Sequence, residues 1–316
     1  MAFRSGFVSI IGRPNAGKST LLNTLVGEKL AIVTCKPQTT RNRIQGIVNV
    51  DRKSTCPAGQ VVLVDTPGVH KPSNSLNRRM MKEVYDALEG CDLLLLIVDA
   101  AQKFASGDQF VLDIAKKSRQ PCFLLLNKID KLDKPRLLPL IAEYSERHDF
   151  CQVIPISAMK RQGLDTLLNL VVNALPEGPR YFPKDQITDQ PERFLAAELI
   201  REQVLLATEQ EVPYATTALI EEYEEGSRLT RIAATIYCER AGQKGILIGR
   251  QGATLKKIGA AARAQIERRL NTKVFLDLFV KVRPGWRDSR DFLQQTDWRT
   301  QLRRMSQAAE VNDAER

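Results

Sequence analysis

A phosphate-binding loop near the start of the chain constrains the fold more strongly than any other feature of the sequence. Residues 12–20 read GRPNAGKST, which matches the pattern G-x-x-x-x-G-K-[ST]. The apolar run FVSII precedes the loop, and the helical pattern STLLNTLVG follows it. A loop placed between a strand and a helix in this way directs successive backbone N–H groups at phosphates. The sequence therefore predicts an α/β domain that opens with a nucleotide-binding site.

The residue types in this loop suit a nucleotide that carries a cation on its phosphates. Gly12 and Gly17 allow the backbone to wrap around the phosphate groups. Lys18 can reach the β- and γ-phosphates, and Ser19 offers a hydroxyl group to Mg²⁺. We expect every residue of the loop to contact the nucleotide: Gly12, Arg13, Pro14, Asn15, Ala16, Gly17, Lys18, Ser19 and Thr20.

Three later motifs, each at the end of an apolar run, indicate that the base is guanine. VVLVDTPG supplies Asp65, which can hold Mg²⁺ through water, and Gly68, which can bond the γ-phosphate. LLLNKID supplies Asp130, whose carboxylate can accept hydrogen bonds from guanine N1–H and from the exocyclic amine, a pair that adenine does not offer. PISA can present a backbone N–H group to guanine O6. The predicted nucleotide residues in these motifs are Asp65, Thr66, Pro67, Gly68, Asn127, Lys128, Asp130, Ser157 and Ala158.

The order of apolar runs and turn residues predicts two domains. Apolar runs alternate with helix-length segments over residues 7–175, and GIVNV at 46–50 adds a strand. This order indicates a mostly parallel sheet with helices on both faces. The segment PEGPRYFPKDQITDQP contains four prolines and has little periodicity, so it reads as a linker. We expect a nucleotide domain at 1–175, the linker at 176–191, a second domain at 192–298, and a tail at 299–316 that lacks a clear apolar face and is mobile.

The second domain is predicted to be a small α+β fold. Residues 192–210 have helical apolar spacing, and TTALIEEYEE and RIAATIYCER follow as alternating strands. A short helical segment then leads into GRQG, the helix TLKKIGAAARAQIERRL and the strand VFLDLFVKV. The predicted order is therefore helix, strand, strand, helix, loop, helix, strand.

The positive charge of the chain is concentrated in this second domain. Residues 231–290 contain fourteen Lys and Arg residues against four Asp and Glu residues, which accounts for the whole formal net charge of +10. A surplus confined to one segment is typical of a nucleic-acid-binding module, although a solvated basic face is the plainer alternative.

Composition argues against two other classes of protein. The six cysteines are scattered, there is no C-x-x-C pattern, and the chain has only two histidines. We therefore expect free thiols in a reducing compartment rather than a zinc site. No apolar run reaches the roughly 18–20 residues that span a bilayer.

The sequence GILIGRQGATLKKIG, at residues 245–259, resembles the G-x-x-G loop of a type II KH domain. Such a loop lets a nucleic-acid backbone approach closely and clamps about four nucleotides. A simple hinge between two helices is the alternative. Trp286 could stack on a base or could instead cap the edge of the domain. The predicted RNA contacts are Ile246, Ile248, Gly249, Arg250, Gln251, Gly252, Lys256, Lys257, Arg283 and Trp286.

Taken in chain order, the nucleotide motifs resemble those of the TrmE–Era–EngA-type GTPases, and KPQTTR at 36–41 resembles the switch segment of the Era family. The likeness covers about residues 5–295, with a P-loop GTPase domain followed by a type II KH domain. It implies that Thr40 senses Mg²⁺ and the γ-phosphate, although the adjacent Thr39 fits the pattern equally well. The metal ligands are then Ser19, Thr40 and Asp65, and the residues active in hydrolysis are Lys18, Asn15 and Thr40.

Two positions depart from the pattern of Ras-like proteins. Val69 occupies the position where those proteins have the water-orienting glutamine, so slow intrinsic hydrolysis is expected. The same apolar substitution occurs in the Era-like group. Asn15 resembles the asparagine that in relatives helps to coordinate K⁺ in place of an arginine finger; the alternative is a loop residue that bonds its own backbone. The implied cofactors are therefore Mg²⁺ and, as a hypothesis, K⁺.

The resemblance implies a monomeric GTPase that binds the 3′ end of the small-subunit rRNA and acts in small ribosomal subunit assembly. It further implies a cytoplasmic protein with peripheral contact to the inner face of the cell membrane. One alternative is a GTP-dependent membrane-surface or signalling switch whose KH domain docks protein rather than RNA. A nucleotide kinase or ATPase is a weaker alternative, because the Asn-Lys-x-Asp motif favours guanine.

Overall fold

The computed structural model describes residues 2–54 and 56–303, which form two compact units. The first unit comprises Met1–Pro72 and Arg79–Asp189, and the second comprises Ser73–Arg78 and Gln190–Arg316. Each unit has its own sheet and its own core.

The first unit is built on a six-stranded sheet with the strand order β2-β3-β1-β4-β5-β6. Only β2, on the edge of this sheet, runs antiparallel to its neighbour β3, so the predicted mostly parallel sheet is confirmed. The strands are β1 (Arg4–Ile11), β2 (Ile44–Val50), β3 (Gly59–Asp65), β4 (Leu93–Asp99), β5 (Cys122–Asn127) and β6 (Gln152–Pro155).

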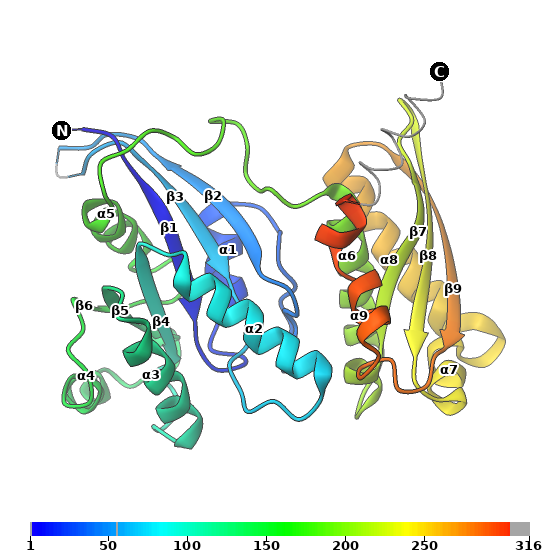
Figure 1. The fold of residues 1–316 in the computed structure, drawn as a ribbon, viewed down its shortest axis with the longest axis horizontal. Helices are drawn as coiled ribbons and strands as arrows, with labels where there is room; N and C mark the ends of the chain where they lie inside the picture. The colour runs from blue at the N-terminus through cyan, green and yellow to red at the C-terminus, as the bar shows by residue number, and fades with distance from the viewer. Residues whose placement is uncertain (1, 55, 304–316) are drawn as a thin grey trace. The chain divides into compact units, whose positions relative to one another are not determined.

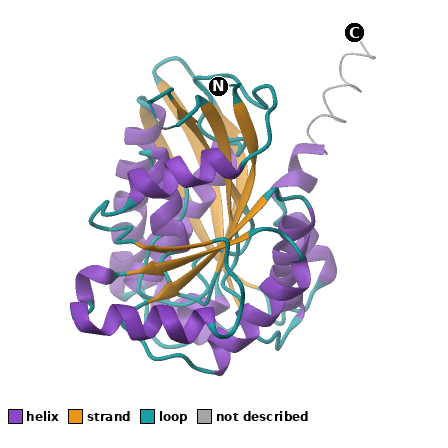
Figure 2. Cartoon of the chain, turned by 90° about the vertical axis from the view of Figure 1, so that its left-hand side faces the viewer, coloured by secondary structure: helices purple, strands orange, loops and turns teal. Residues whose placement is uncertain are grey.

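Helices cover both faces of this sheet (Figure 2). Leu22 of α1 and Val172 of α5 approach β2 and β3 on one face. On the other face, α2, α3 and α4 contribute Val84, Leu112 and Tyr144 to the buried cluster that lies against β4 and β5. The helices are α1 (Lys18–Val26), α2 (Ser75–Glu89), α3 (Ser106–Ser118), α4 (Leu137–Ser145) and α5 (Leu164–Ala174), with short 3₁₀ turns at Ile129–Lys131 and Lys134–Arg136.

The central strands explain why the sequence reads as continuous apolar runs. All six residues of β5 are buried, and β4 is buried up to its last residue, Asp99. Strands that are covered by helices on both faces need apolar side chains at every position rather than at alternate positions. Because the parallel strands end at one edge of the sheet, the polar residues that follow them gather there.

The predicted linker is attached to the first unit over most of its length. The backbone N–H of Ile47 in β2 donates to Ile187 O at 2.8 Å, and Thr188 Oγ1 donates to Gln45 O at 2.6 Å. The side-chain amide of Gln60 in β3 donates to Phe182 O and accepts from the backbone N–H of Phe182. The bonds of Ile47 and Gln45 give partners to backbone groups on the open edge of β2. They explain why the first unit extends to Asp189.

The second unit contains a three-stranded sheet with the order β7-β8-β9 (Figure 1). Strand β7 runs antiparallel to β8, and β9 runs parallel to β8. The predicted order of helices and strands is confirmed, and α9 is an addition to it. The elements are α6 (Glu192–Ala207), a 3₁₀ turn (Val212–Ala215), β7 (Thr217–Glu224), β8 (Leu229–Cys238), α7 (Ala241–Ile248), a 3₁₀ turn (Arg250–Gly252), α8 (Ala253–Leu270), β9 (Lys273–Val282) and α9 (Arg290–Gln295).

The core of the second unit lies between the sheet and helices α6, α7 and α8. Ile200, Ile236 and Ile258 are almost completely buried in it. Of the predicted tail, residues 299–303 continue a helical turn that starts at Trp298. Residues 304–316 lie outside the described part of the chain.

Candidate active site and nucleic-acid interface

A cavity of about 540 Å³ opens where the strands of the first unit end. Its walls come from the loop after β1, the segment before β2, and the residues that follow β3, β5 and β6. The predicted residues that line it are Pro14, Asn15, Gly17, Lys18, Ser19, Thr20, Thr40, Gly68, Asn127, Lys128, Asp130, Ser157 and Ala158. The other predicted nucleotide residues, Gly12, Arg13, Ala16, Asp65, Thr66 and Pro67, do not line it.

The two glycines of the phosphate loop are required by their neighbours. Gly17 has a φ of +106°, and a Cβ atom there would collide with the side-chain amide of Asn127. A Cβ atom on Gly12 would collide with the carbonyl oxygen of Ile97. The loop can therefore take this shape only with glycine at both positions. Lys18 is buried and its ammonium group donates to Gly12 O at 3.1 Å, so it lies across the loop.

Arg13 was predicted to contact the nucleotide, but its side chain does not line the cavity. Its guanidinium group makes an ion pair of 2.8 Å with Asp108 of α3 and turns away from the cavity. Thr66 is likewise occupied, because its hydroxyl donates to Ile10 O at 2.7 Å. The Arg13 side chain thus joins the phosphate loop to α3, and the Thr66 side chain joins the segment after β3 to β1.

The side-chain oxygen atoms of the three residues predicted to bind the metal converge beside the phosphate loop. Ser19 Oγ lies 2.7 Å from Asp65 Oδ2 and 2.9 Å from Thr40 Oγ1, and Thr40 Oγ1 lies 3.2 Å from the same carboxylate oxygen. Thr40 is buried, whereas Thr39 is only partly buried. The geometry therefore favours Thr40 over Thr39. The other carboxylate oxygen of Asp65 is buried and has no hydrogen-bond partner among the described residues.

Burial shifts the charges of this group. Desolvation lowers the pKa of Lys18 to about 8, although the nearby Asp65 carboxylate acts in the opposite direction. Desolvation also raises the pKa of Asp65 to about 6, against the attraction of Lys18 and the hydrogen bonds from Ser19 and Thr40. Without a bound ligand, burial therefore disfavours the charged form of Lys18 and the charged form of Asp65. Phosphates opposite Lys18 and a cation opposite Asp65 would favour those charged forms.

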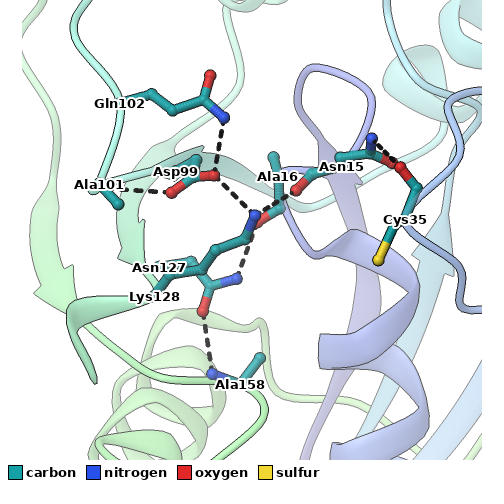
Figure 3. Close-up of polar contacts among 9 residues, drawn as sticks. All are labelled: Asn15, Ala16, Cys35, Asp99, Ala101, Gln102, Asn127, Lys128 and Ala158. Atoms are coloured by element: carbon teal, nitrogen blue, oxygen red, sulfur yellow. Dashed lines mark hydrogen bonds and ion pairs between the residues drawn. The ribbon is translucent and has the colours of Figure 1, made fainter. Parts of the chain in front are cut away.

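At the base end of the cavity, the last residue of β5 and the residue that follows it connect several parts of the site (Figure 3). The side chain of Asn127 donates to Ala16 O at 2.8 Å and accepts from the N–H of Ala158 at 2.9 Å. Lys128 donates to Asn15 O and to Asp99 Oδ2, both at 2.7 Å. Asn127 and Lys128 therefore join the phosphate loop to the PISA segment and to the end of β4.

Asp99 is a residue that the sequence analysis missed. It ends β4 at the same edge of the sheet, and its carboxylate also accepts from the N–H of Ala101 and from the amide of Gln102. The available signal was the single polar residue at the end of the run LLLLIVD. Asp99 fixes the ammonium group of Lys128 over the phosphate loop.

Asp130 is exposed and accepts a hydrogen bond from Ser157 Oγ at 2.5 Å. Its carboxylate is thereby oriented while it still lines the cavity. A carboxylate has about four acceptor positions, so one remains for each of the two guanine donors. This arrangement can recognise guanine.

In the second unit, the GRQG loop has the geometry of a nucleic-acid clamp. Gly249 has a φ of +71°, and a Cβ atom there would collide with the hydroxyl group of Thr254. Gly252 has a φ of +79°, and a Cβ atom there would meet nothing within 4 Å. Gln251, with a φ of +49°, completes a tight left-handed turn between α7 and α8. Open space at Gly252 is what a closely approaching backbone requires.

The side chains around this loop suit an RNA strand. Arg250, Lys256 and Lys257 are exposed, and Ile246 is 51% exposed beside them. Ile248 is partly buried against the core. The exposed apolar surface can contact bases or sugars while the cations attract phosphates. Arg283 is partly buried and its guanidinium group lies 4.1 Å from the centre of the Phe292 ring, so it is directed at the protein rather than outward.

Of the two alternatives for Trp286, the structure contradicts stacking on a base and favours a residue that packs within the domain. Its side chain is 1% exposed, and the indole N–H donates to Ala215 O at 2.9 Å. Its ring also contacts Phe292, so it fastens the segment after β9 to the domain. Two aromatic residues that the sequence analysis missed, Phe275 and Phe279, are instead exposed on β9, at 55% and 50%. Their alternation along a strand was the signal that could have found them.

Comparison with known proteins identifies the family. A profile described as 50S ribosome-binding GTPase matches residues 7–128, and a profile described as KH domain matches residues 211–287. The chain is 51% identical to GTPase Era of Geobacter metallireducens over 93% of its own length and 97% of that protein's length. The chain belongs to the Era family of GTPases. It is also 46% identical to GTPase Era of Ruminiclostridium cellulolyticum, over 95% and 99% of the two lengths.

Solved structures of Era have the same fold. A crystal structure of Era in complex with MgGDPNP and nucleotides 1506–1542 of 16S ribosomal RNA gives a TM-score of 0.89 at 36% identity and covers 94% of this chain and 99% of that chain. A variant of Aquifex aeolicus Era bound to GDP and AlF₄⁻ gives a TM-score of 0.88 at 37% identity, covering 93% and 99%. The predicted P-loop GTPase domain followed by a KH domain is confirmed, and the chain is a GTP hydrolase.

Proposed function

We propose that this GTPase binds the 3′ end of small-subunit rRNA and acts in small ribosomal subunit assembly. The observation that carries the proposal is the pairing, in one chain, of a guanine-nucleotide cavity with an open GRQG loop surrounded by cations. A related Era has been solved with a GTP analogue and a 16S rRNA fragment together. The partners are then GTP or GDP, the rRNA 3′ end and the small ribosomal subunit.

The oxygen cluster at the phosphate loop fits Mg²⁺. Ser19, Thr40 and Asp65 supply hard oxygen ligands, and the buried Oδ1 of Asp65, which has no partner in the described part of the chain, offers one more acceptor. Mg²⁺ is commonly held by one or two carboxylates together with substrate phosphates. Bound there, the cation would neutralise negative charge on the phosphate oxygens. The Era complex with MgGDPNP supports the assignment.

We also propose that Asn15 helps to bind K⁺. The residue is exposed at the cavity wall with a φ of +64°, and its Nδ2 donates to Cys35 O at 2.8 Å. That bond orients the amide so that its oxygen can meet a cation near the phosphates. GTP turnover is expected to be faster in potassium buffer than in sodium buffer, and equal turnover in the two buffers would remove the proposal.

The decisive experiment measures GTP turnover by the full chain with and without an oligonucleotide that copies the rRNA 3′ end. We expect the oligonucleotide to bind and to stimulate turnover, and a scrambled oligonucleotide of equal length and composition to do neither. No binding of the matched oligonucleotide would overturn the rRNA assignment. Binding without stimulation would leave that assignment intact and would indicate that GTP hydrolysis responds to another part of the subunit.

Contact with the inner face of the cell membrane is a further part of the proposal. Among the described residues no helix is long and apolar enough to cross a bilayer. The fourteen cations of residues 231–290 could instead be attracted to anionic headgroups. Flotation with vesicles containing anionic lipid, compared with neutral vesicles, tests this contact, and equal recovery from both would rule out an electrostatic mode.

A further inference from the structure

Two segments that border the phosphate end of the cavity are joined by one side-chain contact. Gln38 Nε2 lies 2.7 Å from His70 Nε2. Gln38 precedes Thr40 by two residues, and His70 follows Gly68 by two residues. Thr40 and Gly68 both line the cavity, and so does Gln38. The contact therefore links the segment before β2 to the segment after β3 at the phosphate end of the cavity.

Val69 cannot supply the function that a glutamine has in Ras-like GTPases. Its side chain has no hydrogen-bonding group, it is 2% exposed, and it belongs to the apolar cluster against β4. Its backbone N–H donates to Gly12 O at 3.1 Å, which holds the side chain in that core. Any group that orients the attacking water must therefore come from another part of the cavity wall.

In the Gln38–His70 contact, the amide oxygen of Gln38 is the group that can orient a water molecule. An amide nitrogen can only donate, so His70 Nε2 accepts and its ring proton resides on Nδ1. Burial lowers the pKa of His70, which favours the neutral ring that this contact needs. With its nitrogen held in this way, the amide of Gln38 has its oxygen free to accept a hydrogen bond from water.

The conformation of the two residues is specific. Gln38 has a φ of +60°, a region that non-glycine residues rarely adopt without a compensating contact. His70 Nδ1 is buried and has no partner among the described residues. The contact with Gln38 is made through the other ring nitrogen, Nε2. The left-handed backbone of Gln38 and its 2.7 Å contact with His70 indicate a fixed arrangement of the two side chains.

We propose that Gln38 is the catalytic residue that orients the attacking water and that His70 is its positioning residue. The water oxygen forms a bond to the γ-phosphorus, and the bond from that phosphorus to the β–γ bridging oxygen breaks. The electron pair of the broken bond stays on GDP, and the proton of the water passes to a phosphate oxygen. The amide oxygen of Gln38 is too weak a base to keep a proton, so it only aligns the water.

The test is single-turnover hydrolysis of pre-bound GTP by the full-length chain. Gln38→Ala is expected to slow hydrolysis about 10- to 100-fold, because loss of alignment at the reacting atoms costs rate rather than affinity. GTP affinity and the melting temperature are expected to stay within about twofold and about 2 °C of the parent. Gln109→Ala, which removes an amide that bonds Asp113 on the surface of α3, is the matched control and should leave the rate unchanged.

Substitutions of His70 test whether this residue positions Gln38. His70→Ala is expected to slow hydrolysis less than Gln38→Ala, and His70→Gln, which can still accept from the amide, is expected to restore much of the rate. The double variant should be no slower than Gln38→Ala alone, because residues that act as one unit are not additive. An unchanged rate in Gln38→Ala, an equal loss of rate and GTP affinity, or additive effects in the double variant would each overturn the proposal.

Discussion

The two glycine loops of this chain look alike in sequence and differ in structure. The loop at residues 12–20 is enclosed by protein: its glycines are required because Asn127 and the backbone of Ile97 approach them. The GRQG loop is open at Gly252, where a side chain would meet nothing within 4 Å. The first loop is thus shaped by the protein before any ligand arrives. The second keeps free space that has a use only when a partner occupies it.

The two loops also differ in how their charged side chains are paired. In the first unit Lys18 lies beside Asp65, and Lys128 pairs with Asp99 at 2.7 Å. Around the GRQG loop, no ion pair to Lys256 or Lys257 is present among the described residues. Paired, buried charges provide specificity for one small ligand, whereas unpaired, exposed cations provide salt-dependent attraction to a polyanion.

The largest effect is expected at the base end of the enclosed site. Asp130→Asn keeps the size of the side chain but replaces one acceptor by a donor, so guanine should lose at least about 100-fold in affinity. Xanthosine triphosphate, which has a carbonyl group where guanine has its amine, should gain. Competition binding with both nucleotides measures this. The control Asp165→Asn, at an exposed position of α5, should change neither affinity, and an unchanged preference in Asp130→Asn would contradict the guanine assignment.

Gly252→Asp tests the open loop. Asp tolerates a positive φ better than most residues, so the fold should be kept while a negative charge enters the free space. RNA affinity should fall at least about tenfold with GTP affinity unchanged. Gly242→Asp makes the same charge change at an exposed glycine of α7 that also has no neighbour within 4 Å, and it should have a much smaller effect. Equal effects of the two variants would show that only net charge matters.

Trp286→Phe tests whether this residue contributes to stability and not to RNA binding. The variant loses the hydrogen bond to Ala215 and part of a buried ring, so the free energy of unfolding should fall by about 1–3 kcal/mol. RNA affinity should not change, because the ring is inside the domain. Urea denaturation and fluorescence anisotropy with a labelled oligonucleotide measure the two quantities. Weaker RNA binding at unchanged stability would contradict the buried position of this residue.

The smallest effect is expected from a single exposed cation. Lys257→Gln should weaken RNA binding modestly and lower the slope of log K against log salt by about one, as expected for one lost phosphate contact. Titrations at several salt concentrations provide the slope. Lys117→Gln, on the surface of α3 in the first unit, is the control and should leave the slope unchanged.

Sequence patterns located the fold and most of the enclosed site because both depend on local order along the chain. Each nucleotide motif follows an apolar strand, and parallel strands bring their ends to one edge. The same patterns could not choose between Thr39 and Thr40, because only the distances to Ser19 and Asp65 distinguish two adjacent threonines. They also missed Asp99, whose role depends on Lys128 reaching it from the neighbouring strand.

The sequence alone determined the kind of chemistry: a phosphate loop with guanine motifs, and a glycine loop inside a basic segment. Those features are short, contiguous and chemically demanding, so they survive without knowledge of the fold. The tertiary structure decided which side chains face a ligand. It placed Trp286 in the core, exposed Phe275 and Phe279, and brought Gln38 to His70 across 32 positions of the chain. Burial and contacts between distant segments depend on how the whole chain packs, and no local pattern contains that information.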